Sequence, residues 1–188
     1  MTIIGARGPS RRQAFRVGPT AVAIAAVLAS AILAGGLAGY RVNLTPSEPL
    51  GIWHIQPLRR AAAVGDIVFI CPPLSATMQI ARQRGYLRSG LCRGGYAPLI
   101  KTIVATAGQH IHIDRSVTID GVVLPHSALS PEDGQGRPIM VAISDSKVGR
   151  GEVFLHSSLP GSFDSRYFGP VPASGILGLA EEVLTYAP

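Results

Sequence analysis

The chain has 188 residues, of which 47% are hydrophobic and 15% charged, and its formal net charge is +6. No acidic residue precedes Glu48, and four positive charges lie in the first 16 residues, at Arg7, Arg11, Arg12 and Arg16. Because no basic run alternates with aromatic residues, the composition argues against a nucleic-acid partner. The 22 glycines and 15 prolines are typical of short strands joined by many turns.

The first predicted element is an apolar run at 17–40, which contains 24 residues without a charge and follows a basic tail at 1–16. A helix of about 20 apolar residues can cross a bilayer. Arginines before the run, and only Arg41 directly after it, predict a cytoplasmic N-terminus and an exported domain at 41–188. The alternative is a cleaved signal peptide, because the run ends in small residues. The run exceeds the usual apolar region of such a peptide, about 7–15 residues, which favours a retained anchor.

The segment 43–53 follows this run closely and reads Asn-Leu-Thr-Pro-Ser-Glu-Pro-Leu-Gly-Ile-Trp. Pro46 and Pro49 fix their own φ angles and push the residues before them toward extended conformations. We therefore expect Ser47 on a rigid extended loop, as a reacting hydroxyl requires. A linker next to a membrane would have a similar composition, so this segment alone does not make Ser47 a nucleophile.

The remaining domain consists mainly of predicted short strands. They are expected at 52–55, 65–70, 99–104, 109–114, 117–120, 122–124, 139–143, 152–155, 176–179 and 183–186. Asp120-Gly121 predicts a hairpin turn, loops are expected at 130–138 and 157–169, and an amphipathic helix is expected within 74–88, ending at Gly85. Closely spaced short strands favour an all-β fold, an antiparallel and partly barrel-like domain behind one N-terminal transmembrane helix.

Two cysteines, Cys71 and Cys92, flank the predicted helix. In an exported domain two cysteines suggest one structural disulfide. The alternative is a pair of free buried thiols. The enclosed segment either covers a functional site and touches substrate or is a plain surface helix, and the sequence does not separate these possibilities.

Lys101 interrupts an apolar run at 99–104. In a strand it shares a face with Leu99 and Ile103, so its ammonium would be desolvated and its pKa would fall below the usual value of about 10.4. A neutral lysine can remove the proton of a serine hydroxyl. Alternatively, the side chain reaches solvent or blocks pairing at a sheet edge.

The histidines give weaker candidates. His110 and His112 would share a strand face, but the spacing shows no third ligand, so no metal and no cofactor are predicted. His54 or His156 could serve a Ser–His–Asp site, yet neither lies in a nucleophile–base motif.

Four segments together resemble the signal peptidase family of Ser–Lys serine peptidases (S26-like), and most closely its TraF-type conjugative-transfer branch. They are the nucleophile segment 43–53, Gly-Asp-Ile-Val-Phe at 65–69, Lys-Thr-Ile-Val-Ala-Thr-Ala-Gly at 101–108, and Ser-Phe-Asp-Ser-Arg-Tyr-Phe-Gly-Pro-Val at 162–171. The chain departs from the family pattern at Ala105, Ala107 and Gln109, where Gly, Pro and an acid are usual. The Gly-Asp-Asn-Arg of housekeeping signal peptidases is also absent, and His-Ser-Ser-Leu stands at 156–159.

The resemblance implies a role for each matching residue. Ser47 would attack the scissile carbonyl, and Lys101 would act as general base and then as general acid to the leaving amine. The N–H of Ser47 and the hydroxyl of Thr45 would stabilise the oxyanion.

Three residues of the last segment have implied supporting roles. Ser162 would orient Lys101, while Asp164 would pair with Arg166 to hold the loop and is counted in the catalytic set of the TraF-type branch. A carboxylate too close to Lys101 would favour the charged amine and oppose its use as a base.

We therefore expect a serine endopeptidase anchored in the bacterial inner membrane, with its active site in the periplasm. Its expected partners are the membrane, an exported precursor such as a conjugative pilin, and other conjugative-transfer proteins. The acyl-enzyme would be hydrolysed or attacked by the N-terminal amine of the substrate, which would give a cyclic product. The alternatives are a general type I signal peptidase and a non-catalytic anchored component of a secretion or pilus apparatus.

Overall fold

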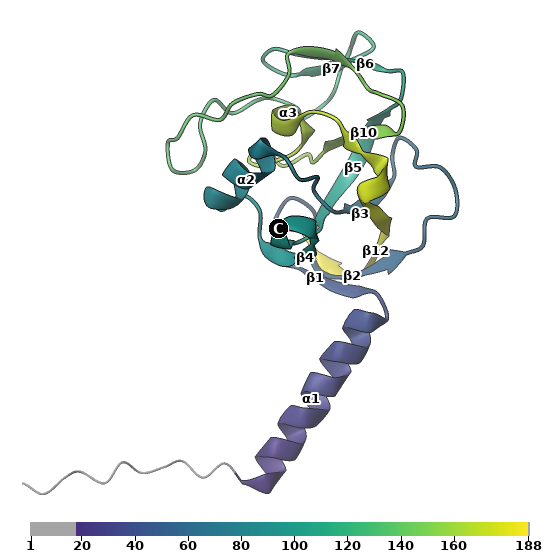
Figure 1. Ribbon diagram of the computed structural model, residues 1–188, viewed down its shortest axis with the longest axis vertical. Coiled ribbons are helices and arrows are strands. Elements are labelled where there is room, and N and C mark those ends of the chain that lie inside the picture. Colours follow the sequence, from purple (N-terminus) through teal and green to yellow (C-terminus); the bar gives the residue numbers. More distant parts are fainter. Residues whose placement is uncertain (1–17, 188) are drawn as a thin grey trace, which may run out of the picture. The chain divides into compact units, whose positions relative to one another are not determined.

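The computed structural model describes residues 18–187 (Figure 1). The basic tail predicted at 1–16 lies outside the described residues. The chain divides between Ala38 and Gly39 into two units, which are considered separately.

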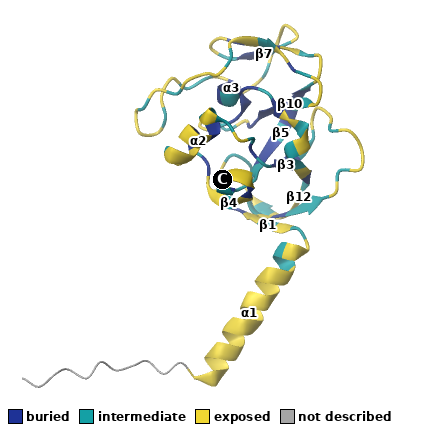
Figure 2. Ribbon diagram, in the orientation of Figure 1, coloured by how far each residue is buried: buried dark blue, intermediate teal, exposed yellow. Residues whose placement is uncertain are grey.

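The first unit contains one helix, α1 (Pro19–Leu37), which begins with a proline in its first turn. Its 19 residues give a length of about 28 Å, and their mean hydropathy reaches 2.2. None of them is buried within the protein (Figure 2), and the helix is apolar on every side. Length and composition suit a membrane span, although a signal sequence would meet the same criteria. The predicted run ends earlier than expected, because Gly39 takes a φ of +93° and Tyr40 already belongs to a strand.

The second unit is built on a seven-stranded antiparallel sheet with the order β1-β2-β12-β3-β5-β10-β11. These strands are β1 (Tyr40–Asn43), β2 (Leu50–Gln56), β12 (Ile176–Tyr186), β3 (Ile67–Ile70), β5 (Leu99–Thr106), β10 (Glu152–His156) and β11 (Val171–Pro172). Among the described strands β1 and β11 do not pair with each other, so the sheet stays open. The predicted antiparallel all-β class is confirmed, and "partly barrel-like" describes it only loosely.

A second antiparallel sheet has four strands in the order β8-β7-β6-β9. They are β8 (Val122–Val123), β7 (Val117–Ile119), β6 (His110–Ile113) and β9 (Asp145–Lys147). The predicted hairpin turn joins β7 to β8, with φ of +49° at Asp120 and +83° at Gly121. Positive φ at both central positions is the conformation that an Asp-Gly pair favours.

Strand β5 lies near the middle of the large sheet, between β3 and β10 (Figure 1). Apolar side chains cover both of its faces. Ile103 belongs to the main core cluster with Val68 and Leu155, whereas Ala105 packs with Ile111 in a second cluster that reaches the small sheet. A central strand buried on both faces explains why its sequence is almost continuously apolar.

The two cysteines form a disulfide, as predicted, with their Cα atoms 5.6 Å apart. The bond joins the residue after β3 to the end of β4 (Ser89–Cys92) and encloses α2 (Ala76–Gln83). Ser75 caps α2 by accepting a hydrogen bond from the N–H of Met78 at 3.2 Å. The helix ends just before Gly85, which has a φ of +82°. Closure of a loop of 21 residues stabilises the fold by about 3 kcal/mol on the chain-entropy model.

Two sequence predictions of strands need correction. The segment 139–143 is not a strand, and the strand of this region is β9, which starts at Asp145. The N–H of Ile139 donates to Pro131 and that of Ala142 to Tyr167, so this backbone is satisfied outside any sheet. The two strands predicted at 176–179 and 183–186 are one strand, β12, whose pairing with β2 and with β3 has register irregularities.

Candidate active site

Ser47 lies in a turn between β1 and β2, rather than on the extended loop that the two prolines suggested. The turn is organised by the side chain of Asn43, the last residue of β1. Its Nδ2 donates to the carbonyls of Thr45, Glu48 and Pro49 at 2.9, 2.9 and 3.0 Å. Its Oδ1 accepts from the N–H of Thr45 at 3.0 Å. One buried amide therefore sets the backbone on both sides of Ser47.

Two further side chains hold the turn against the domain. The Nε1 of Trp53 donates to the Pro49 carbonyl at 2.9 Å, and the indole itself is fully buried. The hydroxyl of Ser157 donates to the carbonyl of Ser47 itself. This hydrogen bond ties the turn directly to the loop after β10, which is 110 positions away in the sequence.

Lys101 lies on β5 opposite Val68 of β3, and its exposed fraction is only 3%. Burial lowers the pKa of its ammonium from the ordinary value to about 8, although the carboxylates of Asp164 and Glu48 act in the opposite direction. The Arg166 guanidinium lowers the pKa further. An appreciable share of the amine is consequently neutral near pH 8, as a general base requires.

Asp164 and Arg166 form a fully buried, two-pronged ion pair, as the sequence predicted. Nε and an Nη of Arg166 donate to the two carboxylate oxygens at 2.8 Å each. Other N–H groups of Arg166 donate to the carbonyls of Ala128, Leu159 and Ser162, each at 3.1 Å. Because Arg166 neutralises the carboxylate, Asp164 holds the loop without fully stabilising a charged Lys101.

Ser162 is buried, and its Oγ has no hydrogen-bond partner within residues 18–187. The hydrogen bond to Lys101 that the family resemblance implies is therefore not made in this conformation. Burying a hydroxyl without a hydrogen-bond partner costs free energy. A hydrogen bond to a group that enters the site would remove this cost.

Thr45 is half-buried, and its hydroxyl is occupied by a hydrogen bond. Its Oγ1 donates to the Oδ1 of Asn43 at 2.7 Å, and a hydroxyl has a single proton to donate. Thr45 therefore helps to build the turn, whereas its expected role as an oxyanion donor requires a different rotamer. The N–H of Ser47, in contrast, donates no hydrogen bond among the described residues.

Ser47, Lys101 and Ser162 line one open cavity of about 450 Å³. Five parts of the chain contribute to its walls: the end of β1 with the turn at 41–47, Phe69 of β3, the segment 86–89, the start of β5 with the residues before it at 97–101, and the loop at 159–163. The predicted nucleophile, base and orienting residue thus meet at one accessible site, while Asp164 lies behind them in the core. A second cavity of about 360 Å³ shares the wall at 161–163.

Glu48 is a titratable neighbour that the sequence reasoning did not consider. Its side chain is half-buried, and this burial raises its pKa to about 7, while Lys101 lowers it and Glu182 raises it. The carboxylate is in turn one of the groups that raise the pKa of Lys101. Its position next to Ser47 was visible in the sequence, but its burial was not.

Asn43 and Ser157 were also missed. Asn43 lies within the nucleophile motif, and an asparagine beside a proline-containing turn often bonds to nearby backbone. That pattern could have identified it. For Ser157 the sequence offers no comparable pattern, because its contact with Ser47 depends on the fold.

The histidines do not enter the site around Ser47. His54 lies 3.8 Å from Glu181, and burial lowers the pKa of His156, whose Nε2 has no partner among the described residues. His110 and His112 contact Asp145 at 2.8 and 3.3 Å on the exposed small sheet. Within residues 18–187 no group of three or more metal-ligating side chains is arranged to hold an ion.

Comparison with known proteins identifies one peptidase family and several relatives named for conjugal or plasmid transfer. The family described as "Signal peptidase, peptidase S26" matches residues 12–185. The probable conjugal transfer protein TraF of Sinorhizobium fredii is 60% identical over 157 residues, which cover 84% of this chain and 83% of that protein. The conjugal transfer protein TraF of Agrobacterium tumefaciens is 53% identical, with 87% and 93% covered. The plasmid transfer protein TraF of Escherichia coli is 41% identical, with 84% and 91% covered.

A crystal structure of a signal peptidase I from Enterococcus faecalis V583 is 18% identical, with a TM-score of 0.38. The matched region covers 64% of this chain and 97% of the signal peptidase I chain. The site described above does not depend on this overlap.

Proposed function

Since this chain belongs to the signal peptidase family, peptidase S26, we propose that it is a membrane-anchored serine endopeptidase that uses a Ser–Lys mechanism. The observation that supports the mechanism best is the meeting of Ser47 with a buried Lys101 in one cavity. A non-catalytic anchored component would need neither the apolar environment of the lysine nor a serine held beside it.

In the acylation step the neutral amine of Lys101 takes the proton of the Ser47 hydroxyl as Oγ bonds to the scissile carbonyl carbon. The N–H of Ser47 donates to the developing oxyanion, and a single donor of this kind contributes about 3–4 kcal/mol. The C–N bond then breaks, and the Lys101 ammonium gives its proton to the leaving amine. In this proposal the Ser162 hydroxyl, which is buried and without a partner among the described residues, accepts a hydrogen bond from the ammonium during this transfer.

In the deacylation step Lys101 is again neutral and accepts a proton from the second nucleophile. Attack by water releases a linear product, whereas attack by the N-terminal amine of the substrate closes a ring. In both routes the Lys101 ammonium returns a proton to the Ser47 oxygen and restores its hydroxyl. The proposed mechanism therefore permits both a hydrolase and a cyclase.

The substrate that we propose is an exported precursor used in conjugative transfer, such as a pilin. The support comes from relatives named as conjugal or plasmid transfer proteins, at 41–60% identity over most of the chain. The apolar helix α1 and the family indicate membrane anchoring. We propose that the membrane is the bacterial inner membrane and that the domain faces the periplasm. A general signal peptidase is the alternative within the same chemistry.

The test is the mass of a pilin precursor co-expressed with this protein or with its Ser47→Ala variant. Ser174→Ala is the matched control, because Ser174 is an exposed serine outside the cavity. We expect terminal trimming with the unchanged protein and with the control, and none with Ser47→Ala. A product lighter than the trimmed linear peptide by one water would identify a cyclase. Trimming that persists with Ser47→Ala would contradict the proposed mechanism.

A further inference from the structure

The segment enclosed by the disulfide contributes a wall of the cavity that contains Ser47 and Lys101. Tyr86, Arg88 and Ser89 of this segment all line the cavity. The helix α2 precedes them in the same disulfide loop. The segment is therefore part of the site, and the interpretation as a plain surface helix is wrong for its second half.

This wall is fixed to the rest of the domain at several points. The carbonyl of Arg88 accepts a hydrogen bond from the N–H of Ala97 at 2.8 Å. Gly90 packs so closely that a Cβ on it would lie 2.4 Å from the Cα of Ala97. On the other side, the hydroxyl of Tyr86 donates to Asp133 at 2.6 Å. With the disulfide at Cys92, these contacts hold the backbone around Arg88 in one position.

The charges that line the cavity are all positive. They belong to Arg41, Arg88 and Lys101, and none of the described lining residues is an aspartate or glutamate. Glu48 and Asp164 act on Lys101 but do not line the cavity, so an anionic group of a ligand would meet no carboxylate among the described lining residues. A cationic side chain in a ligand would instead be repelled.

Arg88 differs from the arginines before it in the same loop. Arg82 donates to the carbonyl of Gly94 at 2.8 Å, and Arg84 to that of Pro138 at 2.8 Å. The guanidinium of Arg88 is exposed and makes no hydrogen bond or ion pair with any residue in the described range 18–187. The fold thus uses the first two arginines for structure, whereas the third lines the cavity without such a contact.

We propose that the disulfide-closed segment determines the specificity of the peptidase, and that Arg88 selects a carboxylate in the substrate near the scissile bond. This proposal rests on the proposed peptidase function. A guanidinium presents paired N–H donors that match the two oxygens of a carboxylate, and such charge-assisted pairs are stronger than neutral hydrogen bonds. The carboxylate belongs either to an acidic side chain or to a free C-terminus, and the chemistry of recognition is the same.

The experiment measures kcat/KM of the full-length protein in detergent micelles with internally quenched peptides that have alanines around the cleavage site. Glu, Gln or Lys is placed in turn at each of the neighbouring positions. Each peptide is made with a C-terminal acid and with a C-terminal amide, which separates a side-chain carboxylate from a terminal one. We expect the acidic form at one position to be cleaved about tenfold faster than its neutral counterpart.

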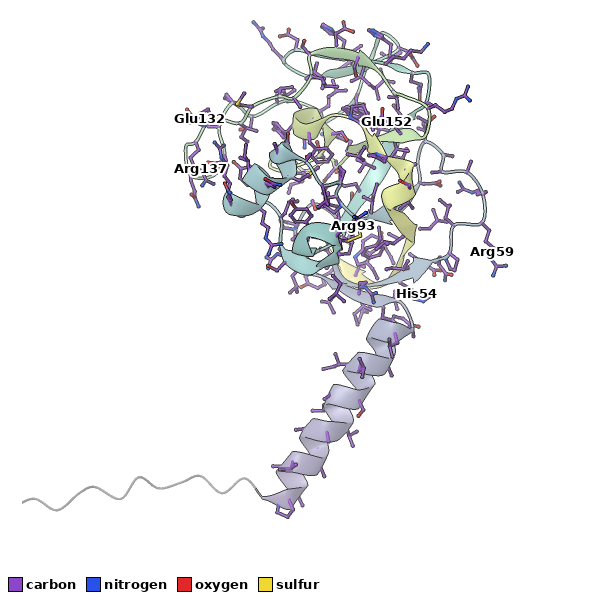
Figure 3. The ribbon with its side chains drawn as sticks, viewed as in Figure 1. His54, Arg59, Arg93, Glu132, Arg137 and Glu152 are labelled. Carbon is purple, nitrogen blue, oxygen red and sulfur yellow. A yellow bond between two sulfur atoms is a disulfide. The ribbon has the colours of Figure 1, made fainter. Side chains whose placement is uncertain are left out.

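Arg88→Gln should abolish this preference, and Arg88→Glu should turn it into a preference for lysine. Arg93→Gln is the matched control, because Arg93 is an exposed arginine of the same region that does not line the cavity (Figure 3). It should keep the preference of the unchanged protein. Equal cleavage of acidic and neutral peptides by the unchanged protein, or an unaltered preference in Arg88→Gln, would overturn the proposal.

Failure of the proposed peptidase function can be distinguished from failure of the selectivity proposed for Arg88. In that case neither the unchanged protein nor Arg93→Gln cleaves any peptide, and the pilin precursor also remains uncut. The selectivity assigned to Arg88 then falls with the peptidase on which it depends.

Discussion

Ser47 and Lys101 line the same cavity, but the fold fixes them in different ways. Ser47 sits in a turn whose backbone is set by the polar side chains of Asn43 and Ser157. Lys101 sits in the central part of the large sheet, where apolar neighbours and the pairing of β5 with β3 hold it. The position of the proposed nucleophile depends on a few directed hydrogen bonds, whereas the pKa of the proposed base depends on burial.

This difference predicts how substitutions near Ser47 and at Lys101 would affect the site. Loss of one hydrogen bond should shift the serine and leave the core intact. A change at the lysine should instead alter proton affinity, because the low polarity around it is what makes the amine a base. The two kinds of support can therefore be separated by experiment.

The largest effect is expected at Lys101. Lys101→Met removes the base but suits the apolar surroundings, so processing should fall by at least about 10³-fold while the thermal midpoint stays the same or rises. Lys101→Arg should be equally inactive, because a guanidinium does not give up its proton, and it should also be less stable. Kinetics and thermal unfolding of the purified protein check both variants.

Lys147→Arg, on an exposed part of β9, is the control and should behave as the unchanged protein. Appreciable activity of Lys101→Met would mean that Lys101 is not the base.

An intermediate effect is expected at Asn43. Asn43→Ala removes the amide that organises the turn, so kcat should fall by about 10–100-fold, because a small displacement of a reacting group is costly. The free energy of unfolding should fall by about 1–3 kcal/mol. Asn43→Asp keeps the acceptor for Thr45 but loses the donors to three carbonyls, so it should not restore kcat. Normal turnover in Asn43→Asp would show that these donors are dispensable.

The smallest effect is expected at Glu48 and appears as a change in pH dependence. In the unchanged protein kcat/KM should rise with pH as Lys101, with a pKa of about 8, loses its proton. The ionised Glu48 raises that pKa, so Glu48→Gln should move the rise to lower pH and increase activity near pH 7 by roughly two- to fivefold. Glu132→Gln is the control, because Glu132 is an exposed carboxylate that acts on neither Glu48 nor Lys101, and its pH profile should match that of the unchanged protein.

The same variant should change stability with a definite sign. Burial raises the pKa of Glu48 in the folded state to about 7, so the stabilisation from its protonated form is present at low pH and is lost as the pH rises through about 7. Above that pH, Glu48→Gln should be more stable than the unchanged protein. Chemical denaturation at pH 5 and pH 8.5 measures the free energy of unfolding of both proteins. A difference between them that is the same at both pH values would contradict the raised pKa of Glu48.

Several parts of the fold were predictable because their cause is local. The turn at Asp120-Gly121 follows from the ability of these residues to take positive φ, and α2 ends where Gly85 takes the same kind of conformation. The disulfide followed from the count of cysteines in a domain that the sequence predicted to be exported. These predictions needed no knowledge of distant contacts.

The wrong predictions of secondary structure concern segments whose conformation depends on contacts with residues far away in the sequence. The segment 139–143 is apolar enough to be a strand, yet Met140 is 84% exposed. The N–H groups near it donate to Pro131 in a loop and to Tyr167 in the short helix α3 (Ser165–Phe168). The strand β1 was missed because Tyr40 was counted in the apolar run before it. Its strand character follows from pairing with β2, which the apolar pattern does not show.

By itself the sequence determined the apolar segment, the all-β class, the disulfide, and the candidates Ser47, Lys101, Ser162 and the Asp164–Arg166 pair. These follow from composition, local backbone preference and motif resemblance, which are properties of short stretches of chain. Only the tertiary structure decided that Asn43 and Ser157 hold the turn with Ser47, that Glu48 is half-buried and acts on Lys101, and that Arg88 lines the cavity. Burial and contacts between distant segments exist only once the sheet is assembled, and they set both the pKa of Lys101 and the charge of the site.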